Sequence, residues 1–164
     1  MNNIPAVVYR EEVMESDLEG VHSVVRSSGF FSPEETAVAM ELVAERLKSG
    51  KASGYFFLFA EHEREVVGYT CYGPVPCTES SYDLYWIAVH DDFRFLGLGR
   101  ELLERTEKEI RALGGSRIYI ETSSRGQYEP TRAFYRKCGY RDEAIFKDFY
   151  APGDSKIVYV KTIA

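Results

Sequence analysis

The chain has 164 residues, 45% of them hydrophobic, and a formal net charge of −6, so it is long enough to fold as one domain with its own core. We do not expect it to bind nucleic acid, because nucleic-acid binders usually present a basic face. No apolar run approaches the ~20 residues that cross a bilayer, and the N-terminus lacks the basic-then-apolar order of a signal peptide. The three cysteines have no metal-ligand spacing, which indicates reduced thiols and no metal site. We therefore expect a single cytoplasmic domain over residues 1–164 with no nucleic-acid, membrane or metal partner.

The first third of the chain predicts a strand followed by two helices. Val7-Val8-Tyr9 is the centre of the expected strand. A capping-box pattern, Ser16-x-x-Glu19, starts the first helix, which ends at Gly29. A second start signal, Ser32-Pro33-Glu34-Glu35, opens a helix that Gly50 ends.

The middle of the chain predicts a hairpin and then a parallel pair of strands. Residues 55–60 and 66–72 are β-rich runs joined by a charged turn, and residues 82–89 form a third, central strand. A helix is predicted next, because apolar and small residues recur at helical spacing and Gly114-Gly115 then ends it; the recurring residues are Leu102, Leu103, Thr106, Ile110 and Leu113. Residues 117–122 return to a strand, and the strand–helix–strand order implies a parallel pair with a crossover connection.

The last part of the chain predicts one short helix and two strands. Glu129-Pro130 opens the helix and Gly139 ends it, after which residues 140–150 and 156–161 are β-rich. The resulting order, β-α-α-β-β-β-α-β-α-β-β, predicts an α+β fold. Its mixed, mostly antiparallel sheet would have about seven strands and helices on both faces.

A glycine-rich loop, Arg94-x-x-Gly97-x-Gly99, lies between the central strand and the long helix. A helix start offers unpaired N–H groups and the positive end of the helix dipole, and glycine lets an anion approach that backbone closely. The loop is therefore a candidate phosphate site. It is not a Rossmann fingerprint, because Leu102 stands where the third glycine is needed, and no Gly-Lys-Ser/Thr of a Walker loop occurs.

The loop resembles the pyrophosphate loop, Arg/Gln-x-x-Gly-x-Gly/Ala, of the GNAT acyl-CoA N-acetyltransferases. The stretch 131–140 is similar to the GNAT ending, in which a helix closes with Phe134-Tyr135-x-x-x-Gly139-Tyr140. This resemblance implies a three-layer α/β/α fold with a splayed central parallel pair. It also implies direct transfer of an acetyl group from acetyl-CoA to a primary amine in a ternary complex, with coenzyme A as product. Asp91 and Tyr128 depart from the family, which often has Pro and Asn at these positions.

The resemblance also implies which residues bind the cofactor. A bulge near Ala88 would free backbone groups of Ile87 and Val89 for the pantetheine arm, and the Val89 N–H would polarise the thioester carbonyl. The charges of Arg94 and Arg100 would add to the pyrophosphate site; the alternative is that both are solvated surface residues. The resemblance implies two further cofactor contacts: Tyr135, and Tyr128, which stands at the position of the family's asparagine. The N–H groups expected to hold the pyrophosphate belong to Phe95, Leu96, Gly97, Leu98, Gly99 and Arg100.

Three side chains are candidates for acid–base catalysis. A lysine-like amine, with a pKa of about 10.4, must lose a proton before it can attack. Glu121, at the end of the strand beside the cofactor gap, and Asp83, at the start of the central strand, are the candidate bases; Asp83 could instead be a strand-end surface charge. Tyr135 is the candidate acid that protonates the leaving thiolate, with packing beside Phe134 as the alternative.

The acceptor is expected to be an amine of a small molecule or of a peptide. Phe30 and Phe31, between the two N-terminal helices, either fill the core or line a ligand cleft, and Glu34 and Tyr150 are further candidates for acceptor contacts. A homodimer is possible. The competing hypothesis is a catalytically silent GNAT domain that binds or senses an acyl-CoA, and an assay with a panel of amines separates the two.

Overall fold

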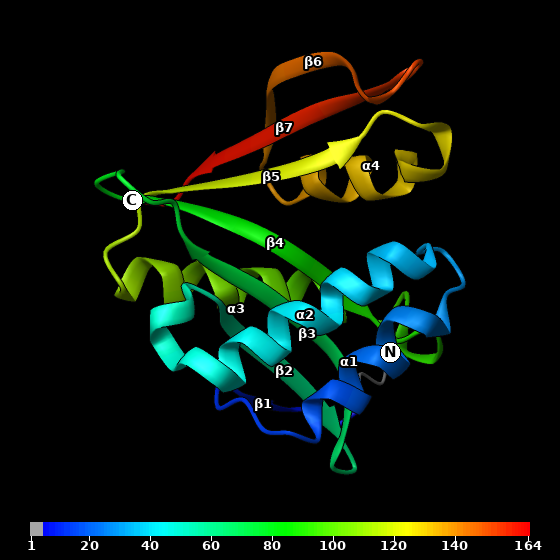
Figure 1. Cartoon of the computed structure of the whole chain (residues 1–164), viewed down its shortest axis with the longest axis vertical. Helices are drawn as coiled ribbons and strands as arrows, with labels where there is room; N and C mark the ends of the chain where they lie inside the picture. Colours follow the sequence, from blue (N-terminus) through cyan, green and yellow to red (C-terminus); the bar gives the residue numbers. More distant parts are fainter. Residues whose placement is uncertain (1–4) are drawn as a thin grey trace. The chain divides into compact units, whose positions relative to one another are not determined.

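The computed structural model describes residues 5–164 and contains one mixed seven-stranded sheet in the order β1-β2-β3-β4-β5-β7-β6 (Figure 1). The α+β fold class and the sheet of about seven strands are confirmed. The helices are α1 (Asp17–Ser27), α2 (Pro33–Ser49), α3 (Leu98–Ala112) and α4 (Glu129–Lys137). The strands are β1 (Val8–Arg10), β2 (Phe56–His62), β3 (Glu65–Pro74), β4 (Ser81–Val89), β5 (Arg117–Ser123), β6 (Arg141–Ala151) and β7 (Asp154–Thr162).

The chain folds into two compact units. The first unit comprises the chain up to Gly73 together with Trp86–Lys108, and the second comprises Pro74–Tyr85 and Glu109–Ala164. Strand β4 and helix α3 each contribute to both units. The expectation of one domain over residues 1–164 stays a prediction.

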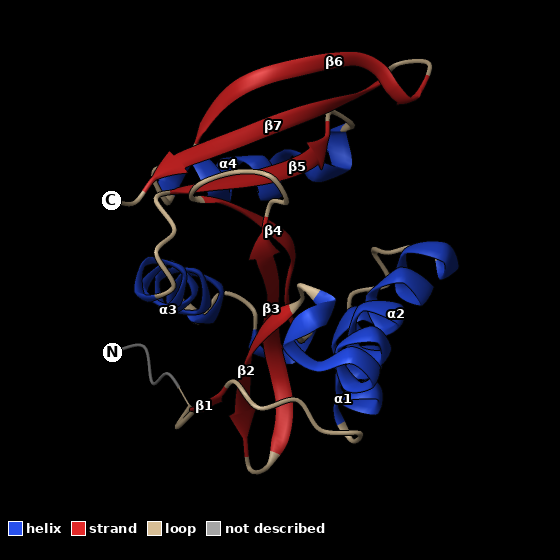
Figure 2. Cartoon of the chain, turned by 60° about the vertical axis from the view of Figure 1, so that its left-hand side comes forward, coloured by secondary structure: helices blue, strands red, loops and turns tan. Residues whose placement is uncertain are grey.

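In the first unit, helices cover both faces of the β2–β3 hairpin (Figure 2). Successive residues of a strand point to opposite faces. Phe57 and Phe59 accordingly pack in one buried cluster with residues of α1 and α2, whereas Leu58 and Ala60 pack in another with Leu98 and Leu102 of α3. The turn residues Glu63 and Arg64 both have positive φ, 50° and 70°, which is the geometry of a two-residue type I′ hairpin.

The two predicted helix starts have different outcomes. Ser32 forms the expected capping box: its hydroxyl accepts from the Glu35 N–H, and the Glu35 side chain accepts from the Ser32 N–H. The capping box predicted at Ser16 is wrong. Ser16 has helical angles, φ −60° and ψ −18°, and its side chain makes no capping hydrogen bond. The carboxylate of Asp17, the first residue of the helix, instead accepts the N–H of Met14 at 2.7 Å.

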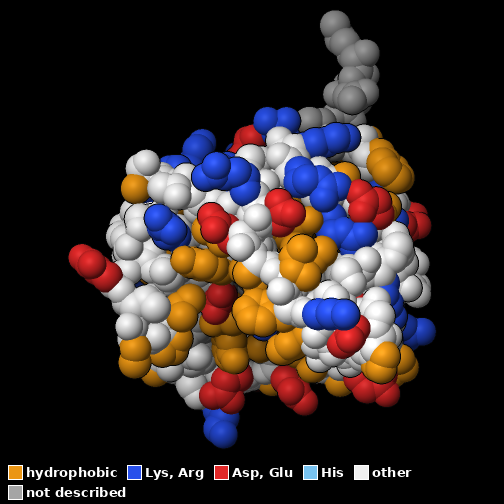
Figure 3. Space-filling model, turned by 90° about the horizontal axis from the view of Figure 1, so that it is seen from above, with side chains coloured by type: hydrophobic (Ala, Val, Ile, Leu, Met, Phe, Trp, Pro, Cys, Tyr) orange, Lys and Arg blue, Asp and Glu red, His pale blue; other side chains and the backbone are white. Residues whose placement is uncertain are grey.

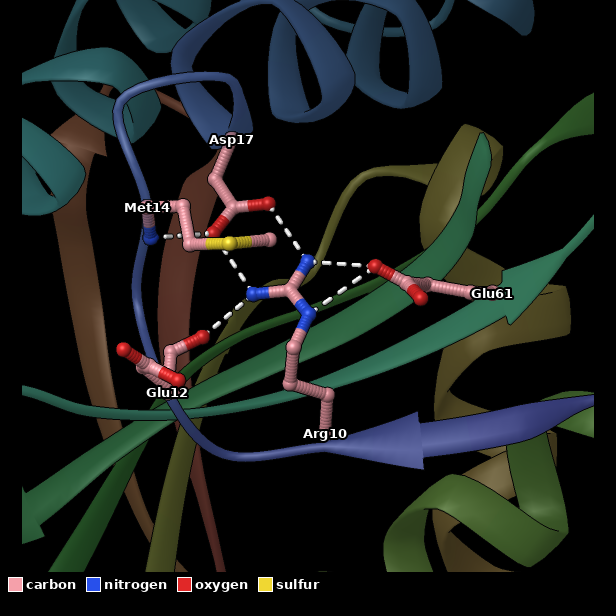
Figure 4. A network of polar contacts seen from close by, with 5 residues as sticks. All are labelled: Arg10, Glu12, Met14, Asp17 and Glu61. Carbon is pink, nitrogen blue, oxygen red and sulfur yellow. Dashed lines mark hydrogen bonds and ion pairs between the residues drawn. The ribbon is translucent and has the colours of Figure 1, made fainter. Parts of the chain in front are cut away.

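Asp17 belongs to a partly buried ion-pair network that joins β1, α1 and β2 (Figure 4). Arg10 donates to both Asp17 oxygens at 2.8 and 2.9 Å, to Glu61 Oε1 at 2.6 and 2.9 Å, and to the carbonyl of Glu12. Asp17 is only 1% exposed. The hydrogen bond to Asp17 is the largest cause that raises the pKa of Arg10, so the guanidinium remains charged and holds α1 to the sheet.

In the second unit, β4 and β5 form the predicted parallel pair. The ladder consists of Ser81–Arg117, Tyr82–Ile118 and Asp83–Tyr119, and β5 then continues to Ser123. On its other side β5 pairs antiparallel with β7, which pairs with β6. Helix α4 covers one face of this part of the sheet, where Tyr135 contacts Tyr159 of β7 at 5.9 Å between ring centroids.

Candidate active site

The candidate phosphate loop lies in the first unit, between the end of β4 and the start of α3. A short 3₁₀ turn, Asp91–Phe93, follows β4, and α3 begins at Leu98. Gly97 has φ +84°, a left-handed conformation that favours glycine, and nothing lies within 4 Å of where its Cβ would be. The Glu101 N–H donates to the Gly97 carbonyl at 3.1 Å. The N–H groups that precede Glu101 in the helix have no acceptor within a preceding helical turn, so this helix start can hold an anion.

Two arginines flank the loop, and both are engaged in exposed ion pairs. Arg94 lies 3.2 Å from Asp91 Oδ1, and its guanidinium is 5.2 Å from the Phe95 ring centroid. Arg100 lies 2.9 Å from Glu104 Oε1. Because exposed ion pairs typically contribute only ~0–1 kcal/mol, either arginine can turn to a phosphate at little cost. The two interpretations of these arginines, as solvated surface residues and as ligands of the pyrophosphate, are therefore compatible.

The end of β4 presents its side chains alternately to the two buried clusters of the first unit. Ala88 packs against the cluster of α1 and α2, and Val89 packs against the cluster that contains Leu98. Strand β4 ends at Val89, and the N–H of the next residue, His90, donates to the Val67 carbonyl at 2.8 Å. The cofactor contacts expected from Ile87, Ala88 and Val89, and the bulge near Ala88, stay predictions.

The candidate acid, Tyr135, is buried on α4 in the second unit. It is 5% exposed, and its ring lies 5.7 Å from that of Phe134, 6.1 Å from Tyr140 and 5.9 Å from Tyr159. Burial raises the pKa of Tyr135, with a smaller contribution from Cys138. The phenol therefore keeps its proton at neutral and moderately alkaline pH, as a general acid must.

The two candidate bases lie on the opposite face of the sheet from Tyr135. Ile120 is paired with Tyr159, the strand partner that contacts Tyr135, so Glu121 points to the other face. Asp83 is paired with Tyr119 and shares the face of Glu121. Burial raises the pKa of Asp83, and the charge of Glu121 raises it further. The structure therefore brings Asp83 and Glu121 close enough to interact, with Glu121 exposed and Asp83 half-buried.

The expected acceptor residues are divided between the two units. In the first unit, Phe31 packs against Trp86 at 5.2 Å and against Phe30 at 5.3 Å between ring centroids, and both phenylalanines are partly buried. Phe31 belongs partly to the core, which supports the first of its two readings, while Glu34 is exposed in the first turn of α2.

In the second unit, Tyr150 lies near Glu121. Burial raises the pKa of Tyr150, followed in size by the charges of Glu121, Asp154 and Tyr128. Tyr128 stands at the end of a 3₁₀ turn and directly before α4, and the Arg125 guanidinium lies 5.4 Å from its ring centroid. Tyr150 is thus a neighbour both of the candidate base and of Tyr128.

Sequence reasoning missed one residue beside the candidate base, and it missed two exposed aromatic rings. Lys156 Nζ lies 3.5 Å from Glu121 Oε1, and it also lies 4.0 Å from the ring centroid of Phe149 and 4.9 Å from that of Phe146. A signal was present: Ile145, Phe146, Phe149 and Tyr150 occupy both odd and even positions of one strand, so a single buried face cannot accommodate all four.

Two further features concern the described residues as a group. Among residues 5–164, no three His, Cys, Asp or Glu side chains come together in an arrangement that could hold a metal ion. Over the same residues, none of the helices has both the length and the apolar character needed to cross a membrane.

Comparisons with known proteins place the chain among acetyltransferases. Residues 23–140 match the model of the acetyltransferase (GNAT) family. A solved structure from Desulfovibrio desulfuricans, which its description assigns to the GNAT family, is 48% identical with a TM-score of 0.95, covering 97% of this chain and 100% of that one. An IAA acetyltransferase of Azospirillum brasilense is 40% identical over 92 residues, which is 55% of this chain and 57% of that protein. An N-alpha-acetyltransferase of Sulfurisphaera tokodaii is 28% identical over 120 residues, 67% of this chain and 69% of that protein.

These similarities differ in how much of each related protein they cover and in how close the sequences are. The chain thus matches less than two thirds of the length of the Azospirillum relative. Two solved N-acetyltransferases that are 18% identical, with TM-scores of 0.76 and 0.74, share the fold, and both are described as complexes with coenzyme A.

Proposed function

We propose a reaction from one premise: the chain belongs to the acetyltransferase (GNAT) family, and is therefore an acyltransferase enzyme. The proposed reaction is transfer of an acetyl group from acetyl-CoA to a primary amine by direct attack in a ternary complex. The acceptor is an amine of a small molecule or of a peptide N-terminus. We further propose that the enzyme works in the cytoplasm, alone or as a homodimer.

The observation that carries the proposal is the loop at the start of α3. It combines a glycine with φ +84°, the N-terminus of a 15-residue helix and two arginines whose ion pairs are exposed. These features suit the pyrophosphate of acetyl-CoA, which the loop backbone from Phe95 to Arg100 would hold. When bound, acetyl-CoA supplies an activated acetyl group.

The remaining roles are assigned residue by residue. Backbone groups of Ile87 and Val89 bind the pantetheine arm, and the Val89 N–H stabilises the negative charge that develops on the carbonyl oxygen. Glu121 takes the proton of the ammonium group, with Asp83 as the second candidate. Tyr135 gives its proton to the departing thiolate, whose conjugate thiol has a pKa of about 8.5 if it behaves like cysteine.

The test of the loop is the substitution Gly97→Val. A valine at φ +84° is strained, and its side chain would fill the space in front of the helix start. We expect acetyl-CoA to raise the Tm of the wild type and to leave the Tm of this variant unchanged. Gly54→Val is the matched control, because Gly54 also has positive φ, +78°, and also has nothing within 4 Å of its missing Cβ. An equal acetyl-CoA shift in all three proteins would contradict the loop assignment.

A catalytically silent acyl-CoA-binding domain is the competing proposal. It predicts the same thermal shift without acetyl transfer. Release of coenzyme A thiol, measured with and without a panel of amines, separates the two, because an enzyme of the proposed kind accelerates release only when an acceptor amine is present.

A further inference from the structure

Three exposed aromatic residues on β6 form a continuous surface, which we call the aromatic ledge: Phe146, Phe149 and Tyr150. They are 49%, 54% and 47% exposed. The rings of Phe146 and Phe149 lie 6.5 Å apart, and those of Phe149 and Tyr150 lie 5.1 Å apart in an edge-to-face arrangement. Figure 3 looks at the molecule from the β6 side and shows hydrophobic side chains gathered on the visible face, with acidic side chains among them.

The irregular pairing of β6 with β7 produces the ledge. Phe146 is paired with Lys156 and Ala151 with Asp154, so four residues on β6 face a single residue on β7. The bulged segment is held in place at Asp148, which has φ +54°. Its N–H donates to Ser155 Oγ at 3.2 Å, and its Oδ1 accepts the Gly153 N–H at 2.8 Å. The ledge is therefore built on a fixed turn.

The ledge is continuous with the candidate base. The Lys156 ammonium lies against the rings of Phe149 and Phe146, at 4.0 and 4.9 Å from their centroids, and 3.5 Å from Glu121 Oε1. The Lys156 side chain is only 14% exposed. An amine that gives its proton to Glu121 would therefore have these aromatic rings as its neighbours.

The charges around the ledge do not favour a polycation. Glu121 has Lys156 beside it, and Asp154 is paired with Arg125 at 3.1 Å. Asp83 lies half-buried, and burial disfavours its charged form. An acceptor with several ammonium groups would thus find carboxylates that already have cationic partners, whereas an apolar group would cover exposed rings and gain free energy.

We propose that the aromatic ledge binds the apolar part of the acceptor, so that the preferred substrate is a primary amine carried on an aromatic group rather than a polyamine. This inference rests on the proposed function, since it takes Glu121 as the base. The same chemistry occurs in a free aromatic amine and in a peptide whose first residue is phenylalanine, and both are included in the test.

The test compares kcat/KM for four acceptors: 2-phenylethylamine, a short peptide with N-terminal phenylalanine, ethylamine and spermidine. For the wild type we expect one of the two aromatic acceptors to be used best, and the better one identifies the source. Phe149→Ala is expected to lower kcat/KM for that acceptor by ~5-fold, as the loss of one aromatic contact does, mainly through KM. The KM for acetyl-CoA and kcat/KM for ethylamine are expected to stay unchanged.

Two controls separate binding from structural damage. Phe149→Tyr keeps an aromatic ring and is expected to restore most of the lost kcat/KM. Leu113→Ala removes an equally exposed apolar side chain that follows α3, 50% exposed, and is expected to behave as the wild type. An equal loss for ethylamine and the aromatic acceptor in Phe149→Ala, or no rescue by Phe149→Tyr, overturns the proposal.

The acceptor panel also distinguishes failure of this inference from failure of the proposed function. Preference for spermidine or ethylamine overturns the ledge proposal and leaves the amine acetyltransferase intact. Binding of acetyl-CoA without transfer to any acceptor overturns both.

Discussion

The partly buried network around Arg10 allows a stability prediction whose size follows from its geometry. Asp17→Ala removes a carboxylate that is 1% exposed and that accepts three hydrogen bonds: two from Arg10, at 2.8 and 2.9 Å, and one from the Met14 N–H at 2.7 Å. The variant leaves the partly buried Arg10 guanidinium and the Met14 N–H without these acceptors.

The expected loss lies at the lower end of what breaking a buried ion pair costs. Removal of one partner of such a pair typically costs ~3–5 kcal/mol. Arg10 retains two hydrogen bonds to Glu61 and is partly accessible to water, so about 3 kcal/mol is the appropriate figure. For a chain of this length, each kcal/mol shifts the Tm by ~2–4 °C, which gives a decrease of roughly 6–12 °C.

The assay is thermal and urea unfolding of Asp17→Ala beside the wild type and Glu104→Gln. Glu104 pairs with Arg100 at 2.9 Å on the exposed surface of α3, and loss of such a pair typically costs less than ~1 kcal/mol. A fall of less than 2 °C for Asp17→Ala, or equal falls for both variants, would refute the reasoning that burial makes the Arg10 network stabilising.

Two other predictions concern groups whose pKa is shifted. Tyr135→Phe keeps the ring and removes the hydroxyl, so we expect kcat to fall by ~10-fold or more with the acetyl-CoA affinity and the Tm almost unchanged; a near wild-type kcat would make Tyr135 a packing residue. The folded-state pKa of Asp83 is raised, so its ionised form destabilises the fold, and wild-type stability falls as pH rises from about 3.9, the unfolded value, through the raised pKa. Asp83→Asn is therefore expected to raise the Tm at pH 7 but not near pH 4, and equal Tm differences at the two pH values would contradict this assignment.

Most elements could be predicted because their signals are local. Apolar spacing and glycine stops identified α3 and α4 nearly to the residue, and the Ser32-Pro33 start identified α2. The prediction of a capping box at Ser16 was wrong because of a contact that is not local in the sequence. Asp17, one residue later, is recruited by Arg10, which is seven positions away in β1, and this contact sets the conformation of the helix start.

The parts of the candidate site that have local signals could likewise be identified from the sequence, whereas the parts that depend on strand pairing could not. The phosphate loop is one continuous segment, so its glycines and its helix start could be identified together, and the distance of Tyr135 from Gly139 was enough to assign it to the family motif. The aromatic ledge could not be placed, because it depends on a register shift between β6 and β7 that no local pattern in the sequence encodes. Lys156 likewise reaches Glu121 across a strand pair, 35 positions along the chain.

The alternation along β5 has a consequence for the proposed chemistry. Ile120 belongs to the face that α4 covers, and Glu121 belongs to the other, so the proposed acid and the proposed base act from opposite faces of the same strand. The ladder with β4 ends at Tyr119, one residue before this point. Because the attacking nitrogen and the departing sulfur are bonded to the same carbon in the tetrahedral intermediate, both residues can act on it only if that carbon lies beyond the end of this ladder, at the edge of β5 that β4 no longer pairs.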